Sequence, residues 1–199
     1  EWHALRKTKI TATDASVIAN VDGGNDLEFI FVMSNFTNQG GYCNFVGRIF
    51  VYKANGQLLP GWSQYLPCYP FAPAAGDIDA NGDMEIVVAD NEKGVYVFNH
   101  DGTLYPGWPQ PSYFAPRPIT LADVDRNDNG RLELVFFSQR PYYMGYIYVM
   151  NDDGTVVPGW PQPLSYWNTF EDTIVADIDG NDNGAMEIVA EAADKIYVF

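Results

Sequence analysis

Two phrases recur along this chain, and their repetition restricts the fold more than any other feature of the sequence. The first phrase starts with Asn-Gly or Asp-Gly and ends in Pro-Gly-Trp, and its copies occupy residues 55–62, 101–108 and 153–160. The second is an acidic loop followed by an apolar run, and its copies begin at Asn20, Asp77, Asp123 and Asp177. The loops start 57, 46 and 54 residues apart, and the Pro-Gly-Trp phrases are 46 and 52 residues apart. Matching spacing of two independent phrases indicates a repeat architecture.

Each repeat unit has the pattern of short strands joined by turns, and the second unit shows this most clearly. Residues 85–89 form a continuous, mostly β-branched apolar run, which is typical of a strand covered on both faces. Residues 95–98 predict a second strand, and the Asp-Gly pair at 101–102 predicts a hairpin turn. We expect a third strand at residues 103–105 and a fourth at 119–122. No segment keeps a 3.6-residue apolar period, so no helix is expected.

Four strands in a unit of about 50 residues predict an all-β fold built from β-propeller blades rather than a sandwich. The expected units are residues 1–62, 63–108, 109–160 and 161–199, and the last unit lacks its outermost strand. Three explanations of that gap are open. The chain is a fragment of a longer propeller, residues around Trp2 to Ile10 complete the last blade, or a neighbouring copy supplies the missing strand.

The acidic loops have the residue pattern of a calcium site. In the second loop, oxygen-bearing side chains fall at alternate positions, namely Asp77, Asp79, Asn81, Asp83 and Glu85. Alternate residues of a tightly curved loop point toward one centre, and the Gly at loop position 6 permits the positive φ that such curvature needs. Hard Ca²⁺ takes about six to eight oxygen ligands, whereas Mg²⁺ prefers fewer protein ligands and Zn²⁺ prefers Cys and His. The alternative for any single loop is a polar surface turn without an ion.

We therefore expect three calcium sites and a weaker fourth. The third and fourth loops keep the pattern but reach their Glu two residues later, and the candidate ligands there are Asp123, Asp125, Asn127, Asn129 and Glu133, and Asp177, Asp179, Asn181, Asn183 and Glu187. The first loop offers Asn20, Asp22, Asp26 and Glu28. It has Asn at position 1 and Gly24, which has no side-chain oxygen, at position 5. This first site is expected to be weak, completed by water, or empty.

The loops and the strands that follow them resemble the FG-GAP/VCBS repeats of calcium-binding β-propellers, including the head of integrin α subunits. The resemblance covers almost the whole chain, and the Asp-Gly-Thr-x-x-Pro-Gly-Trp-Pro variant resembles repeats of bacterial and archaeal secreted proteins. It implies that each loop lies between the first two strands of a blade and binds Ca²⁺, with Asp83 supplying its backbone carbonyl. Family propellers commonly have seven blades, so four units would make roughly half a ring.

Composition limits the partners and the compartment. The formal charge is −15, which argues against nucleic acid and anionic membrane surfaces and for cations. The 47% hydrophobic content is too high for a disordered acidic chain. No transmembrane helix is expected, residues 1–7 do not have the pattern of a signal peptide, and an extracellular or secreted location is expected from the resemblance. Cys43 and Cys68 either form one disulfide or are two buried thiols.

The aromatic residues suggest two further roles. Trp62, Trp108 and Trp160 are interpreted as plugs between blades, with a carbohydrate-stacking shelf as the alternative. The aromatic segments 65–71, 142–146 and 166–167 vary between units, as expected of loops that bind a protein or glycan ligand. No catalytic residues are predicted, because no nucleophile, metalloprotease or phosphate-binding motif occurs. The hypotheses are an adhesion or assembly module, a carbohydrate-binding or lyase-like module, and a self-assembling subunit.

Overall fold

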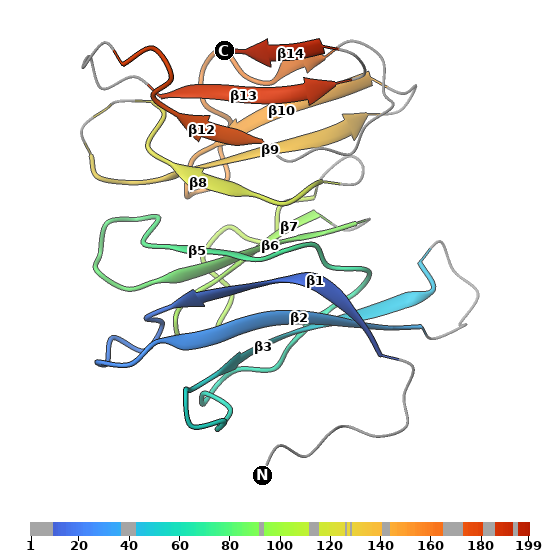
Figure 1. Cartoon of the computed structure of the whole chain (residues 1–199), viewed down its shortest axis with the longest axis vertical. Helices are drawn as coiled ribbons and strands as arrows, with labels where there is room; N and C mark the ends of the chain where they lie inside the picture. Colours follow the sequence, from blue (N-terminus) through green and yellow to red (C-terminus); the bar gives the residue numbers. More distant parts are fainter. Residues whose placement is uncertain are drawn as a thin grey trace.

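A computed structural model of the chain contains fourteen strands in its described part and no helix there (Figure 1). The structure describes residues 10–36, 43–91, 94–111, 116–125, 127, 129–140, 144–164, 173–180, 186–192 and 195–199. Within these ranges no helix has the length and the apolar character needed to cross a membrane. The strands form four antiparallel sheets of three or four strands, which confirms the all-β prediction.

The first and third sheets each have four strands in chain order. The first contains β1 (Ile10–Ala19), β2 (Glu28–Phe36), β3 (Phe45–Tyr52) and β4 (Gln64–Leu66). The third contains β8 (Thr120–Ala122), β9 (Glu133–Arg140), β10 (Met144–Met150) and β11 (Gln162–Leu164). In both sheets the short outermost strand follows the Pro-Gly-Trp phrase. That phrase therefore turns the chain back onto the outer edge of the sheet it has just left.

The second and fourth sheets each have three strands. The second contains β5 (Ala74–Gly76), β6 (Glu85–Asp90) and β7 (Gly94–Phe98), and the fourth contains β12 (Ile174–Ala176), β13 (Glu187–Ala192) and β14 (Lys195–Val198). In the second sheet a single β-bridge between Val95 and Gln110 takes the place of a fourth strand. Prolines on both sides of Gln110 shorten this pairing, because proline has no N–H to donate to a strand ladder.

The four sheets are stacked face to face in chain order (Figure 1). Each neighbouring pair encloses an apolar core, so every inner sheet contributes to two cores. In β6, Val88 faces the first sheet and Val87 faces the third, and the whole strand is buried. This explains why residues 85–89 read as a continuous apolar run, and it confirms the prediction of a strand covered on both faces.

Two strand assignments from the sequence are wrong. Residues 103–105 form no strand, because the tight hairpin allows only one β-bridge, between Phe98 and Leu104. Residues 119–122 do not complete the second sheet, since Thr120–Ala122 is β8, the first strand of the third sheet. The sheets accordingly include residues 10–66, 74–110, 120–164 and 174–198.

The Pro-Gly-Trp phrase joins each sheet to the next one, as the plug interpretation predicted. The indole N–H of Trp62 donates to the His100 carbonyl at 2.8 Å, and that of Trp108 donates to the Asp152 carbonyl at 2.7 Å. Both acceptors lie in the hairpin of the following sheet, and both Trp side chains are buried. Gly61 has φ 85°, and a Cβ on it would collide with the Asp101 carbonyl. Glycine is needed there for the turn and for the close approach of that hairpin.

Cys43 and Cys68 form a disulfide, which settles the alternative left open by the sequence. Their Cα atoms are 5.8 Å apart, and the bridge closes a segment of 25 residues. Cys68 is fully buried, and its N–H donates to the buried Asp90 carboxylate at 2.7 Å. The disulfide ties the segment before β3 to the segment that leads from the first sheet into the second.

Candidate metal centres

Three of the four acidic loops bring carboxylates together at equivalent places. Each loop connects the first strand of a sheet to the second strand, and its Glu is the first residue of that second strand. The groups are Asp77, Asp79 and Glu85, then Asp123, Asp125 and Glu133, then Asp177, Asp179 and Glu187. Within a group, one ligand atom from each residue lies within 4.8 Å of the others. Each of these three groups could hold a metal ion.

This spacing fits a large, hard cation. Two oxygens bound to one Ca²⁺ at about 2.3–2.6 Å can be at most about 5 Å apart. In each group the ligand atoms lie within 4.8 Å of one another, which is compatible with this condition. Carboxylates are hard ligands, and the described residues bring no His or Cys into these groups, so the donor set suits Ca²⁺ better than Zn²⁺.

The second loop is held in shape by its own backbone. The Asn81 N–H donates to Asp77 at 3.0 Å and to Asp79 at 3.2 Å, and the Gly82 N–H donates to Asp77 at 2.9 Å. Gly82 has φ 97°, the left-handed conformation expected of this glycine. The Asp83 side chain instead lies 3.5 Å from the His100 imidazole and is not part of the carboxylate group, so its backbone carbonyl stays the predicted ligand atom.

The third loop tolerates its two additional residues. Glu133 Oε2 accepts the Val124 N–H at 2.8 Å and the Asp125 N–H at 3.3 Å, in the same manner as Glu85 accepts the Ile78 N–H at 3.1 Å. In this longer loop, side-chain oxygens accept from backbone N–H groups two residues further on. The Asn127 side chain accepts the Asn129 N–H, and the Asn129 side chain accepts the Arg131 N–H. The amide oxygens of Asn127 and Asn129 are thereby used inside the loop.

The fourth loop has the same Glu contact. Glu187 Oε2 accepts the Ile178 N–H at 2.9 Å, and the Gly180 N–H donates to Asp177 at 2.7 Å. Asn181 and Asn183 lie outside the described residues. The placement of these two predicted ligands stays a prediction.

The first loop is organised differently, and it is not among the carboxylate groups of the described chain. Glu28 still accepts the Val21 N–H at 2.8 Å, and Gly24 N–H donates to Asp22 at 2.9 Å. The other oxygen of Asp22 lies 2.6 Å from the Lys53 ammonium. This ion pair lowers the pKa of Asp22 and raises the pKa of Lys53. At loop position 1, Asn20 donates to the Gly24 carbonyl at 2.8 Å, while its buried Oδ1 accepts no hydrogen bond from a described residue.

Burial of the strand-opening Glu residues gives the metal-free loops an electrostatic cost. Glu28, Glu85 and Glu133 are each 1% exposed. Burial raises the pKa of Glu85 to about 7, with a further contribution from Asp79, Asp77 and Asp83. Burial likewise raises the pKa of Glu133, against the opposing effect of its two backbone donors. A bound cation would remove this cost by stabilising the ionised carboxylates.

A hydrogen-bonded link that sequence reasoning missed joins the second loop to the third. The Tyr105 hydroxyl lies 3.0 Å from Asp79 and 3.2 Å from the nearly buried Asp152, and Asp152 is 2.8 Å from Arg131 of the third loop. Burial and the hydrogen bond to Asp79 raise the pKa of Tyr105. Asp152 directly precedes the Asp-Gly pair of its hairpin, so the sequence offered only its position as a signal.

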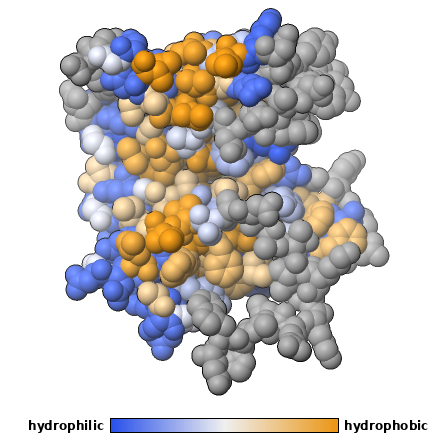
Figure 2. Space-filling model, in the orientation of Figure 1, coloured by the Kyte–Doolittle hydropathy of each residue, from blue (hydrophilic) through white to orange (hydrophobic). Residues whose placement is uncertain are grey.

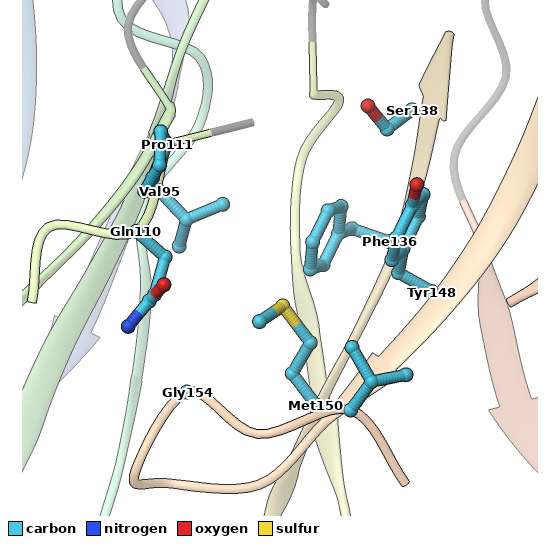
Figure 3. Close-up of a pocket in the computed structure, with 9 residues that line it drawn as sticks. Val95, Gln110, Pro111, Phe136, Ser138, Tyr148, Met150 and Gly154 are labelled. Carbon is cyan, nitrogen blue, oxygen red and sulfur yellow. The ribbon is translucent and has the colours of Figure 1, made fainter. Parts of the chain in front are cut away.

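An apolar pocket of about 200 Å³ lies apart from these groups, between the second and third sheets (Figure 3). Its lining residues are Val95, Gln110, Pro111, Phe136, Ser138, Tyr148, Met150, Gly154 and Val156. Its described lining residues offer two hydroxyl groups, those of Ser138 and Tyr148, and are otherwise mostly apolar.

The aromatic segment 65–71 is mostly packed rather than open. Tyr69 contacts the rings of Phe45 and Phe71, and the Arg117 guanidinium lies 5.0 Å from the centre of the Phe71 ring. Tyr65 is the exposed member. Residues 142–143 and 166–167 lie outside the described part of the chain, so a binding role for these aromatic loops stays a prediction.

Comparison with protein-family models, with curated proteins and with solved structures finds no match for this chain.

Proposed function

We propose that the chain is a calcium-binding β-propeller module of an extracellular protein, acting in adhesion, protein interaction or assembly. The observation that carries the proposal is the recurrence of the carboxylate group at three equivalent loops, each with its Glu as the first residue of the second strand of its sheet. A single acidic turn occurs often without an ion. Three copies in the same place of the fold favour a shared ligand.

The order of contacts between the sheets supports a propeller arrangement. The first strand of each sheet contacts the first strand of the next, from β1 to β5, from β5 to β8, and from β8 to β12. This pattern is expected when blades are arranged around an axis with their first strands innermost. In such an arrangement the acidic loops all lie at the same end of the blades.

Calcium would stabilise each of these loops by neutralising its carboxylates. Without an ion, three carboxylates lie within 4.8 Å of one another, and in the second and third loops one of them, the Glu, is buried. An ion that binds the folded loop and not the unfolded chain increases the free energy of unfolding in proportion to the logarithm of its concentration. The disulfide supports an oxidising location outside the cell, where calcium modules bind with dissociation constants of about 0.1–1 mM.

Thermal unfolding in EGTA and in millimolar Ca²⁺ tests the proposal. We expect Ca²⁺ to raise the melting temperature, and we expect Mg²⁺ at the same concentration to do so less. Asp79→Ala should remove one site and reduce the calcium-dependent increase. Asp22→Ala is the matched control, because it changes the same loop position in the first loop. Identical melting curves in EGTA and in Ca²⁺ would refute the calcium proposal.

A second candidate function, head-to-tail self-association, is favoured by the open face of the last sheet. Ile147 and Val149 of β10 are fully buried, whereas their register equivalents in β14, Ile196 and Val198, are 73% and 53% exposed. Apolar side chains gather over this sheet at the top of Figure 2. We propose that the outer face of the first sheet of a second copy covers it.

The outer face of the first sheet, which we propose as the partner surface, carries the kind of side chains found at the interfaces between neighbouring sheets. In the inner interfaces, the aliphatic face of one sheet packs against a face that carries aromatic rings in the next sheet. The outer face of the first sheet carries Phe29, Phe31, Phe50 and Tyr52, and Phe29 is 43% exposed. A head-to-tail contact of this kind closes a ring or extends into a filament.

Light scattering over a concentration series separates these states. We expect the mass to rise with concentration and Ile196→Lys to suppress that rise. Leu104→Lys is the control and should leave association intact, because this exposed residue pairs with Phe98 between the first and second sheets and lies on neither open face. A monomer of constant mass at all concentrations would contradict self-association.

A further inference from the structure

The first hairpin differs from the other two at one informative position. Lys53 stands two residues before the Asn-Gly pair, where the later hairpins have Asn99 and Asn151. Those two amides donate to a threonine hydroxyl of their own hairpin, at 2.9 Å and 2.8 Å. The first hairpin has Gln57 in place of that threonine. The Gln57 side-chain oxygen accepts instead from the Asn55 amide, at 3.2 Å.

Lys53 instead reaches back to the acidic loop of its own sheet. Its ammonium lies 2.6 Å from one carboxylate oxygen of Asp22, while the other oxygen of Asp22 accepts the Gly24 N–H. Asp22 occupies loop position 3, which is the position of Asp79, Asp125 and Asp179 in the metal-binding groups. The ammonium is thus placed against the residue that contributes to an ion site in each of the other loops.

The charges of the four loops agree with this placement. Each of the other groups has three carboxylates, so a divalent ion would leave a net charge of −1. At the matching positions the first loop has two carboxylates, Asp22 and Glu28, because Asn20 replaces an Asp. One ammonium leaves the same net charge of −1. A divalent ion added to the first loop would be repelled by the ammonium that is already there.

We propose that Lys53 is a built-in cation of the first loop, whose ammonium takes the place that a divalent ion has in the other three loops. The comparison with the other loops rests on the proposed calcium function, but the contact between Lys53 and Asp22 does not. The first sheet is therefore held in shape without metal. The competing arrangement is a fourth divalent ion that uses the orphaned oxygen of Asn20.

Hydrogen exchange of single amides in EGTA tests the role of Lys53 without any metal. The reporters are the Val21, Asp22 and Gly24 amides, which donate to Glu28 and Asp22. Lys53→Met should accelerate their exchange about two- to fivefold, which is the effect expected of an exposed ion pair. Lys53→Arg should restore protection, and Lys195→Met, which removes an exposed lysine from β14, should leave these amides unchanged. Unchanged exchange in Lys53→Met would overturn the proposal.

Counting bound ions by calorimetry distinguishes this proposal from the calcium proposal. The wild-type chain should bind three Ca²⁺, and the triple variant Asn20→Asp, Gly24→Asp, Lys53→Asn should bind four. Four ions on the wild-type chain would show that the first loop binds metal despite Lys53 and would overturn the inference. If no Ca²⁺ binds to any loop, the calcium proposal fails, while the exchange measurement still decides the role of Lys53.

Discussion

The residue that defines each loop is the Glu at the start of the second strand. Its carboxylate satisfies backbone N–H groups of the loop with one oxygen, as Glu85 does for Ile78 and Glu133 for Val124. The same side chain is buried in the first three loops and half-buried in the fourth. Burying an ionised carboxylate costs free energy, and the cation that we propose for the loop would offset this cost.

The raised pKa of Glu85 predicts how stability depends on pH when no metal is bound. The folded value of about 7 exceeds the ordinary value of 4.5, so the folded chain binds more protons than the unfolded chain between these pH values. Stability of the metal-free chain should therefore fall as the pH rises from about 5 to 8. Glu133 should contribute in the same direction. The Asp groups with lowered pKa values act only at lower pH.

Melting temperatures measured over this pH range, with and without Ca²⁺, check the prediction. Calcium binding requires the ionised carboxylate, so affinity should increase with pH and compensate for the loss of stability. Glu85→Gln should reduce the pH dependence of the metal-free chain. The same slope in the presence and absence of Ca²⁺ would show that Glu85 does not face an ion.

Among single residues, the sequence predicted best those that recur at the same position of each repeat. The loop carboxylates and the positions of Trp62 and Trp108 follow from a pattern that repeats in register. Lys53 was missed because its partner Asp22 is 31 residues away. The only signal was a lysine where the other two hairpins have asparagine.

At the level of elements, the repeat pattern predicted where the strands lie more successfully than it predicted the sheet to which each strand belongs. The apolar run at 85–89 could be assigned directly because both of its faces are covered. By contrast, the short apolar sequence of β8 would suit the last strand of the second sheet as well as the first strand of the third sheet. The pairing of β8 with β9, in which Ala122 lies opposite Glu133, decides this, and the apolar character of residues 119–122 does not specify the partner strand.

The contact between Pro-Gly-Trp and the next hairpin should be a main source of cohesion between sheets. Trp108→Phe keeps an aromatic ring but leaves the Asp152 carbonyl without its indole donor. We expect a loss of about 1–3 kcal/mol in the free energy of unfolding, measured by urea denaturation. Trp160→Phe is the matched control, because Trp160 packs on Phe199 at 5.5 Å but is only half-buried. Equal losses in both variants would mean that packing, and not the indole donor, holds the sheets together.

For the whole molecule, the charge of −15 is concentrated rather than spread over the surface. Fifteen of the 26 acidic residues lie in the four loops. Three divalent ions would reduce the formal charge to −9, and Lys53 already offsets part of the charge of the first loop. The excess of acids thus lies mainly in the loops between the first two strands of each sheet.

The most direct test of the central claim is a calorimetric titration of the metal-free chain with Ca²⁺ at neutral pH. Three carboxylate groups and a first loop that holds the Lys53 ammonium predict three bound ions per chain. Asp79→Ala should reduce this number to two. Binding of no calcium, or a number of ions that Asp79→Ala leaves unchanged, would contradict the account.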